Sequence, residues 1–254
     1  MSLIVADAKW EPAGHRDSWP AFPQGRDVHV WSVDLCAAAA GPPRWLAPRE
    51  VERAKRFVHA SDARRYARAH LALRAIIGAY LGCNPGLLRF AEQAHGKPRL
   101  HSSTTGLQFN LSHSGDQALL AIGAADELGV DIEAVRADLP GPELAAAVLC
   151  AEELERISQL PANAQAEPFI VCWTRKEACL KALGFGLALE PRTLHVGLEP
   201  CRSGLRVAGH DLELASLRGP TGYCAALAAL GGLGTVSCFD FVPGATSGDT
   251  LAVS

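Results

Sequence analysis

The sequence predicts an α+β fold made of two similar α/β halves. Two observations support this class: strand-like segments are interspersed with helix-like segments, and the order strand, helices, paired strands occurs twice. The join between the two series falls near Ala124, Ala125 and Asp126, so we expect an N-terminal half over 1–124 and a C-terminal half over 125–254. The halves share this order without repeating individual residues.

The N-terminal half is expected to open with a strand over 27–35, where polar and apolar residues alternate. Helical sequence follows over 47–82. Pro48 suits a first helical turn, and a nearly continuous apolar face runs on until Gly82 and Pro85 stop it. Two more strands are predicted over 107–113 and 117–123.

The C-terminal half is expected to start with a strand over 128–135. A turn rich in proline and glycine, 138–142, separates this strand from helical sequence over 143–160. A longer helix is predicted over 165–183, where Gly184 and Gly186 end it flexibly. The β-rich pieces that remain are 193–196, 211–217, 222–230 and 235–242, and residues 244–254 resemble a tail.

The composition is that of a folded domain, because 48% of the 254 residues are hydrophobic and 20% are charged. No apolar run is long enough for a membrane span, and the N-terminus lacks the pattern of a signal peptide, so we expect a cytoplasmic protein without a membrane partner. The eight cysteines include no C-x-x-C pair, which disfavours zinc and predicts reduced, mostly structural thiols.

Charge is unevenly distributed along the chain. The net charge of −3 predicts no nucleic-acid partner. Residues 44–74, however, contain nine Arg or Lys against three acids, whereas residues 126–167 contain ten acids against two arginines. The first segment is suited to phosphate groups and the second to a cation.

Asp131 and Glu133 lie two positions apart on the predicted strand Gly129-Val130-Asp131-Ile132-Glu133, so they share one of its faces. Magnesium is typically held by one or two carboxylates together with water and substrate phosphate oxygens, which makes the pair a candidate half-site. Taken alone, an ordinary solvated strand face is the better explanation of this pattern.

The segment 169–186 reads FIVCWTRKEACLKALGFG, and a helix places Trp173, Glu177 and Lys181 on one face with Lys176 beside them. Glu177 can complete a metal site or accept a proton, and Lys181 can neutralise a phosphate oxygen. The plainer interpretation is a Glu–Lys pair that stabilises the helix by a few tenths of a kcal/mol, with Trp173 as a core residue.

A strand-to-turn segment, FNLSHSGD at 109–116, carries an imidazole between two hydroxyls. Ser112 and His113 offer hydrogen-bond donors to a phosphate. A hydrolase serine is disfavoured because no G-x-S-x-G elbow is present, and an ordinary turn histidine is the plain alternative. Upstream, the turn HGKPR at 95–99 presents Lys97 to a nucleotide, although such surface turns are common.

The four motifs occur in one order: Gly-Lys-Pro, then Phe-Asn-Leu-Ser-His-Ser, then Gly-Val-Asp-Ile-Glu, then Trp-Thr-Arg-Lys-Glu-Ala-x-x-Lys-Ala-x-Gly-x-Gly. In that order, over His95–Gly186, they closely resemble the 4'-phosphopantetheinyl transferases of the surfactin-synthetase-activating type. Segments 48–57 and 65–74 also look like the N-terminal helices of that family. The resemblance covers the chain apart from about the first 25 residues and the tail.

The resemblance implies a pseudo-twofold pair of halves in one chain, with coenzyme A bound in the cleft between them. It implies that Asp131, Glu133 and Glu177 surround Mg²⁺ and that Lys181 contacts the coenzyme A pyrophosphate, with Glu177 and Lys181 as the catalytic residues. The coenzyme A contacts implied in the N-terminal half are Ser112 and His113 on phosphates, Lys97 near the adenine nucleotide, and Arg53 and Arg65 near the 3'-phosphate.

One position departs from the pattern. Some relatives carry a lysine where this chain has Glu50, so part of the basic clamp on the 3'-phosphate is missing. Arg49, Arg53 or Arg56 is then the candidate to replace it.

The implied reaction is magnesium-dependent attack by a carrier-protein serine on the pantetheine-side phosphorus of coenzyme A, which releases adenosine 3',5'-bisphosphate. The expected partners are coenzyme A as co-substrate and an apo acyl, polyketide or peptidyl carrier protein, and the fused halves imply a monomer. Two alternatives stay open: an inactive coenzyme A or carrier-protein binding module of the same fold, and another magnesium phosphotransferase, which the absence of G-x-x-x-x-G-K-[ST] disfavours. Glu177 as base, ligand or both also stays open.

Overall fold

The computed structural model describes residues 11–13, 19–37, 39–92, 96–101, 106–124, 127–136, 141–185 and 188–243, so His95, Gly186 and the expected tail lie outside it. The helices are α1 (Pro48–Ala54), α2 (Ala60–Leu81), α3 (Pro142–Val148), α4 (Ala151–Ser158) and α5 (Ala166–Leu183). The strands are β1 (Glu11–Ala13), β2 (Val28–Asp34), β3 (Phe90–Glu92), β4 (Pro98–Leu100), β5 (Gln108–Ser114), β6 (Gln117–Gly123), β7 (Leu128–Ala134), β8 (Arg202–Val207), β9 (His210–Leu217), β10 (Tyr223–Leu230) and β11 (Val236–Phe241).

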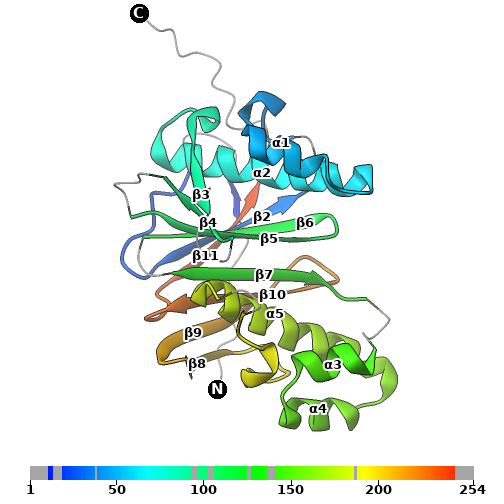
Figure 1. The fold of residues 1–254 in the computed structure, drawn as a ribbon. Helices are drawn as coiled ribbons and strands as arrows, with labels where there is room; N and C mark the ends of the chain where they lie inside the picture. The colour runs from blue at the N-terminus through cyan, green and yellow to red at the C-terminus, as the bar shows by residue number, and fades with distance from the viewer. Residues whose placement is uncertain are drawn as a thin grey trace, which may run out of the picture.

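Two main sheets form the centre of the fold, which confirms the mixed α+β class. The first sheet has the strand order β1-β11-β2-β6-β5, and the second has the order β7-β10-β9-β8, while β3 and β4 form a separate hairpin. Figure 1 shows α1 and α2 above the first sheet, the second sheet below it, and α5 against the second sheet. No helix among the described residues is long and apolar enough to cross a membrane.

The central strands are buried on both faces, so neighbouring residues face different cores. Val30 and Leu119 pack between the two sheets, whereas Trp31 and Leu120, one position further along, belong to the core that includes α2 residues. A third cluster lies between α5 and the second sheet. Side chains that alternate between two apolar environments explain why these strands contain near-continuous hydrophobic runs.

The last strand, β11, leaves the second sheet. It pairs in parallel with β2, with Cys238 opposite Val30, and β1 adds in parallel to its other edge. A strand expected within the C-terminal half therefore completes the first sheet, and the chain crosses the expected boundary at residue 124 to reach it.

Two local expectations were wrong. Residues 193–196 form no strand, because Leu194 and Val196 are buried against the α5 cluster and the backbone N–H and carbonyl of Val196 bond to the side chains of Glu153 and Arg175. The helical stretch at 143–160 is two helices, since the chain leaves helical geometry at Leu149 and Cys150. Strands β1, β3, β4 and β8 were not predicted.

Candidate active site

The two sheets meet along β5 and β7, which are the edge strands on the facing sides (Figure 1). Side chains of β5 bridge this junction: Asn110 Oδ1 accepts from the Val130 N–H at 2.8 Å, and Ser114 Oγ accepts from the Ala134 N–H at 3.2 Å. Asn110, Ser112 and Ser114 are buried and occupy every second position of β5. The spacing of these polar residues indicates that one face of the strand bonds to another part of the protein, but it does not identify the strand that lies opposite.

Helix α5 packs on β7 at Gly129. A Cβ atom added to Gly129 would lie 2.0 Å from the Ala178 carbonyl oxygen and 2.4 Å from the Ala182 backbone nitrogen. Only glycine allows the helix backbone to come this close. The contact brings the Glu177 and Lys181 side chains of α5 to the carboxylates of β7.

Lys181 Nζ is held at the junction. It donates to Asp131 Oδ1 at 2.5 Å and to Ser112 Oγ at 2.9 Å, and it contacts the Val130 carbonyl oxygen at 3.3 Å. Ser112 Oγ in turn donates a hydrogen bond to Asp131 Oδ1 at 2.7 Å. Asp131 is buried, and its Oδ2 has no hydrogen-bond partner among the described residues.

Glu133 lies on the same face of β7, and its Oε2 accepts a hydrogen bond from Ser114 Oγ at 2.7 Å. Burial raises the pKa of Glu133, and the negative charge of Asp131 adds to this, whereas Ser114, Lys181 and the Trp173 indole oppose it. Trp173 is partly buried and packs against the α5 cluster, as expected for a core residue.

Glu177 completes the group of acids. Burial raises the pKa of its carboxyl, the charges of Asp131 and Glu133 raise it further, and the Lys181 ammonium opposes the increase. A carboxylate with a raised pKa is better suited to accept a proton near neutral pH. The structure therefore brings Asp131, Glu133, Glu177 and Lys181, which come from two segments of the chain, to one place.

His113 points away from the junction, because it alternates with Ser112 and Ser114 on β5. The residue is exposed, but neighbouring protein atoms displace water from around part of the ring, and this desolvation lowers the pKa of His113. Electrostatic interaction with His70 and Lys181 acts in the same direction. The ring is therefore neutral at neutral pH and donates through one N–H.

The basic residues expected near coenzyme A lie in three places. Arg65 on α2 donates to Asp116 Oδ1 at 2.7 Å and to Asp62 Oδ1 at 3.0 Å, while Arg53 on α1 is exposed. Lys97 is not beside them: its Nζ donates to the Leu128 carbonyl oxygen at 2.8 Å and pairs with Glu127. Lys97 thus ties its turn to the start of β7, about 10 Å along the strand from Asp131.

Glu50, which departs from the family pattern, is a buried structural residue. Its Oε2 accepts from Arg74 Nε at 2.9 Å and from the Ala47 N–H at 2.6 Å, and its Oε1 contacts His70 Nδ1 at 2.9 Å. Arg74 is 1% exposed and also donates to carbonyl oxygens of the following loop. The carboxylate therefore fixes α1 on α2, a long-range role that sequence spacing does not reveal.

The opposite face of α5 is structural as well. Lys176, expected beside Glu177, points away from it: the lysine is fully buried, pairs with Glu153 at 2.5 Å and donates to the Val148 carbonyl oxygen at 2.8 Å. Its neighbour Arg175 is also fully buried and donates to the Cys201 carbonyl oxygen at 2.7 Å. Lys176 thus anchors α3 and α4 to α5, and Arg175 anchors the segment that follows α5.

One group of possible metal ligands among the described residues, Cys150, Glu153 and His195, has its ligand atoms within 4.8 Å of one another. The Glu153 carboxylate is already satisfied, because it pairs with Lys176 and accepts from the N–H groups of Cys150, Val196 and Gly197. A second cation next to the Lys176 ammonium would be repelled, so the Glu153 carboxylate is a poor metal ligand here.

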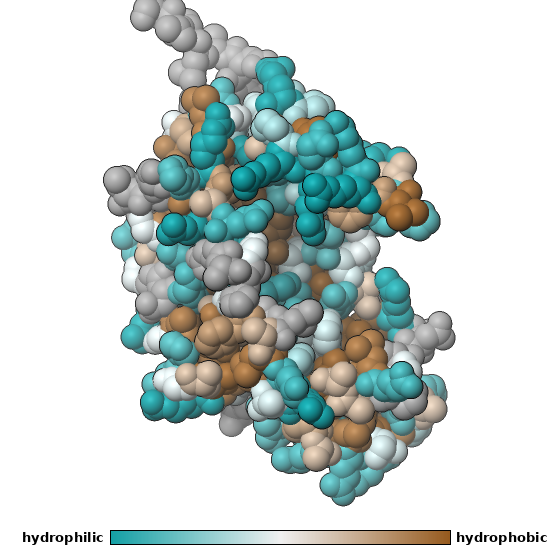
Figure 2. Space-filling model, in the orientation of Figure 1, coloured by the Kyte–Doolittle hydropathy of each residue, from teal (hydrophilic) through white to brown (hydrophobic). Residues whose placement is uncertain are grey.

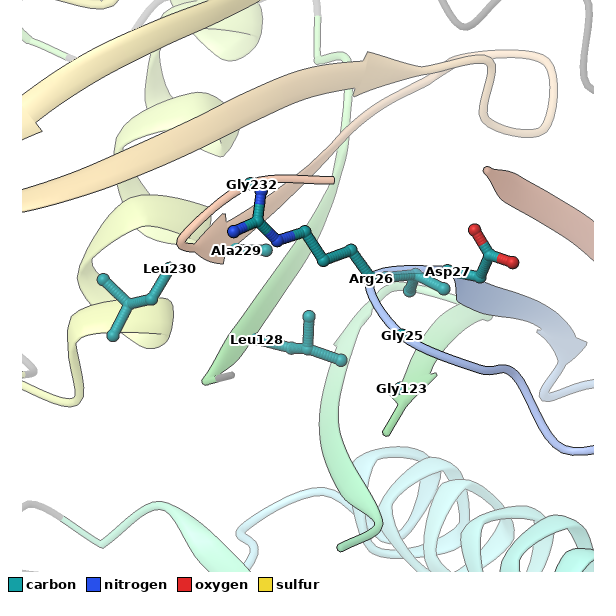
Figure 3. Close-up of a pocket in the computed structure, with 9 residues that line it drawn as sticks. Gly25, Arg26, Asp27, Gly123, Leu128, Ala229, Leu230 and Gly232 are labelled. Atoms are coloured by element: carbon teal, nitrogen blue, oxygen red, sulfur yellow. The ribbon is translucent and has the colours of Figure 1, made fainter. Parts of the chain in front are cut away.

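Two pockets lie near the second sheet. One, of about 10 Å³, is formed where Arg26, Gly123, Leu128 and Gly232 approach one another, and Figure 3 shows Arg26 reaching toward Gly232. It has room for about one water molecule and lies at the far end of the junction from Glu133. The other, of about 560 Å³, is lined by the first half of α5 and the β9–β10 turn. Neither pocket is lined by Asp131, Glu177 or Lys181.

The surface differs between the two layers of the molecule. Figure 2 shows hydrophilic side chains gathered over α1 and α2 and a larger share of hydrophobic ones over the half that carries α3 and α5. The view is indented between these two parts.

The donor set at the junction fits a hard divalent cation. The charge of Asp131 raises the pKa of Glu133, and the charges of Asp131 and Glu133 raise the pKa of Glu177. The buried Asp131 Oδ2 lacks a partner among the described residues, and a cation would supply one. The carboxylates of Asp131, Glu133 and Glu177 are not drawn together as closely as the Glu153 group. A shared ion would therefore require a glutamate to change rotamer.

Comparisons with known proteins identify the family. The model of the 4'-phosphopantetheinyl transferase superfamily matches residues 127–228, and a model of the N-terminal part of 4'-phosphopantetheinyl transferases matches residues 39–125. The 4'-phosphopantetheinyl transferase HetI of Nostoc sp. is 33% identical over 216 residues, which span 82% of this chain and 89% of that protein.

Two further relatives match over shorter stretches. The L-aminoadipate-semialdehyde dehydrogenase-phosphopantetheinyl transferase of Homo sapiens is 32% identical over 169 residues, covering 62% of this chain and 54% of the relative. A 4'-phosphopantetheinyl transferase of Bacillus subtilis is 28% identical over 149 residues, covering 58% of this chain and 64% of the relative. Because the Nostoc relative aligns along nearly its whole length, and the two family models take in both sides of the carboxylate–lysine cluster, the chain belongs to the 4'-phosphopantetheinyl transferase superfamily.

Proposed function

We propose that this chain is a transferase that moves the 4'-phosphopantetheine group of coenzyme A to a serine of an apo acyl, polyketide or peptidyl carrier protein, with release of adenosine 3',5'-bisphosphate. The observation that carries the proposal is the convergence of Asp131, Glu133, Glu177 and Lys181 where the two sheets meet. Membership of the superfamily supports the reaction class.

The cofactor in this proposal is Mg²⁺, held by Asp131, Glu133 and Glu177. The oxygen donors and the unpartnered Asp131 Oδ2 support this assignment. When bound, Mg²⁺ supplies positive charge to the phosphate oxygens of coenzyme A. Lys181 is placed to neutralise a further oxygen, because its ammonium already lies at the same carboxylate.

The proton of the carrier serine goes to a Glu177 carboxylate oxygen in this mechanism. A bond forms between the serine oxygen and the pantetheine-side phosphorus, and the bond from that phosphorus to the bridging oxygen breaks, so the bisphosphate leaves with the electron pair. The raised pKa of Glu177 supports the choice of base. Its role as base and its role as metal ligand are both part of the proposal.

The coenzyme A contacts proposed here come from the N-terminal half. Ser112 and His113 are assigned to phosphates, Arg53 and Arg65 to the 3'-phosphate, and Lys97 to the adenine nucleotide. The exposure of Arg53 supports its assignment, whereas Arg65 must exchange its carboxylate partners for a phosphate. The Ser112 hydroxyl already donates a hydrogen bond to Asp131 and accepts one from Lys181, so it would act on a phosphate by positioning the Lys181 ammonium.

The architecture belongs to the proposal as well. We assign residues 1–124 and 125–254 to two similar halves in a pseudo-twofold arrangement, joined near residue 125 and acting as a monomer in the cytoplasm. The two sheets, each with its own helix-containing core on one side and packed against each other on the other, support this assignment.

The test is an incubation of the protein with coenzyme A, Mg²⁺ and an apo carrier protein, followed by intact mass measurement of the carrier. We expect the mass to rise by one phosphopantetheine group. A carrier that stays apo while coenzyme A binds would indicate an inactive binding module, and phosphate transfer without the pantetheine arm would indicate another phosphotransferase. Unchanged transfer in excess chelator would contradict the metal assignment.

A further inference from the structure

We infer that Ser114 is a positioning residue that orients the Glu133 carboxylate across the junction of the two sheets. The inference rests on the proposed role of Glu133 as a metal ligand and adds a residue from the opposite half to that site. Ser114 Oγ lies 2.7 Å from Glu133 Oε2, and the serine is buried at 9% exposure. This contact joins β5 of the first sheet to β7 of the second.

The direction of the hydrogen bond is set by the backbone. The Ala134 N–H donates to Ser114 Oγ at 3.2 Å, so one lone pair of the hydroxyl is already used by a fixed donor. The single hydroxyl proton therefore goes to Glu133 Oε2. A serine held on its acceptor side by the strand opposite has little freedom to turn elsewhere.

The consequence for Glu133 is a choice of oxygen and rotamer. Ser114 binds Oε2, and the Trp173 indole of α5 also hydrogen-bonds this carboxylate, so Glu133 is held from both β5 and α5. Ser112 does the same for Asp131, since it donates to Oδ1 and leaves the buried Oδ2 without a partner. The two serines thus each hold one oxygen of a β7 carboxylate, so Asp131 and Glu133 are oriented by partners from the opposite sheet, as outer-shell partners orient metal ligands.

The test compares Ser114→Ala with wild type by titrating Mn²⁺ into protein that is saturated with coenzyme A, with the EPR signal of free Mn²⁺ as the readout. Loss of an outer-shell partner typically weakens metal binding by about 10- to 100-fold, and we expect about tenfold here because the partner is neutral. The Mg²⁺ concentration for half-maximal transfer should rise in parallel. Ser114→Thr, which keeps the hydroxyl, should restore both values. If Ser114→Ala does not fold, Ser114→Cys keeps a similar volume with a weaker donor.

Asn110→Ala is the matched control. Asn110 bridges the same two strands through the Val130 N–H and hydrogen-bonds no carboxylate within the described part of the chain, so its loss should lower the melting temperature and leave Mn²⁺ affinity unchanged. Equal Mn²⁺ affinity for Ser114→Ala and wild type, with Glu133→Gln weakened, would overturn the positioning role alone. Equal affinity for wild type and Glu133→Gln would instead remove Glu133 from the proposed metal site, so the two failures are separated.

Discussion

Gly129→Ala is the substitution whose effect the structure constrains most tightly. The new methyl group would lie 2.0 Å from the Ala178 carbonyl oxygen, where ordinary contact begins at 3.4 Å, so α5 and β7 must separate by about 1.4 Å. Overpacking of this kind costs about 1–3 kcal/mol, and the upper end applies because both atoms are backbone and cannot rotate away. A shift of about 1 Å in catalytic groups lowers rates by about 100-fold, so we expect both stability and transfer to fall.

The assay pairs urea unfolding with transfer to an apo carrier protein, measured under conditions in which the variant is folded. Gly204→Ala is the matched control, because Gly204 lies in β8 of the same sheet and its nearest atom to an added Cβ, the Leu212 carbonyl oxygen, is 3.9 Å away. The control should change stability by less than about 1 kcal/mol. Wild-type stability and turnover in Gly129→Ala would refute the argument that this contact sets the position of Glu177 and Lys181.

Three more predictions follow from the site and the core. Glu177→Gln should lower transfer by about 10²- to 10⁴-fold at an unchanged melting temperature, because it removes the carboxylate proposed to accept the serine proton. Transfer at the wild-type rate in this variant would count against Glu177 as the base. Lys176→Met leaves the buried Glu153 without its cation and should lower the free energy of unfolding by about 3 kcal/mol. Turnover per folded molecule should stay at the wild-type value. A loss of turnover at unchanged stability would instead indicate that Lys176 acts in the active site. Burial lowers the pKa of His29 from 6.5 to about 4, so between these pH values the unfolded chain binds more protons than the folded chain. The free energy of unfolding should therefore fall by about 3 kcal/mol from pH 7 to pH 4. His29→Gln should reduce this fall, and acid-unfolding curves identical to those of wild type would contradict the argument.

The candidate site could be predicted to a useful extent because its groups follow local periodicity. Asp131 and Glu133 share a face since a strand repeats every second residue, and Glu177 and Lys181 share a face since they are one helical turn apart. The order of the motifs along the chain then supplied the family. Which roles these residues perform stays a prediction, and the structure adds only that they meet.

The environment of single cations could not be predicted from the same patterns. Lys176 looked like a companion of Glu177, but its partner is Glu153, which lies in a different helix. Lys97 was expected in a surface turn that meets a nucleotide, and the structure pairs it with Glu127. Partners separated by tens of residues are brought together only when the sheets and helices pack, and spacing along one element carries no information about them.

The sequence by itself determined the α+β class, most strands and helices, and the four acidic and basic residues at the junction, because near neighbours along the chain dictate strand alternation and helical faces. Only the tertiary structure decided that β11 completes the first sheet, that Glu50 anchors α1 to α2, and that Ser112 and Ser114 of one sheet hold the carboxylates of the other. These contacts depend on which buried surfaces exclude water together, which is a property of the whole packed chain and not of any one segment.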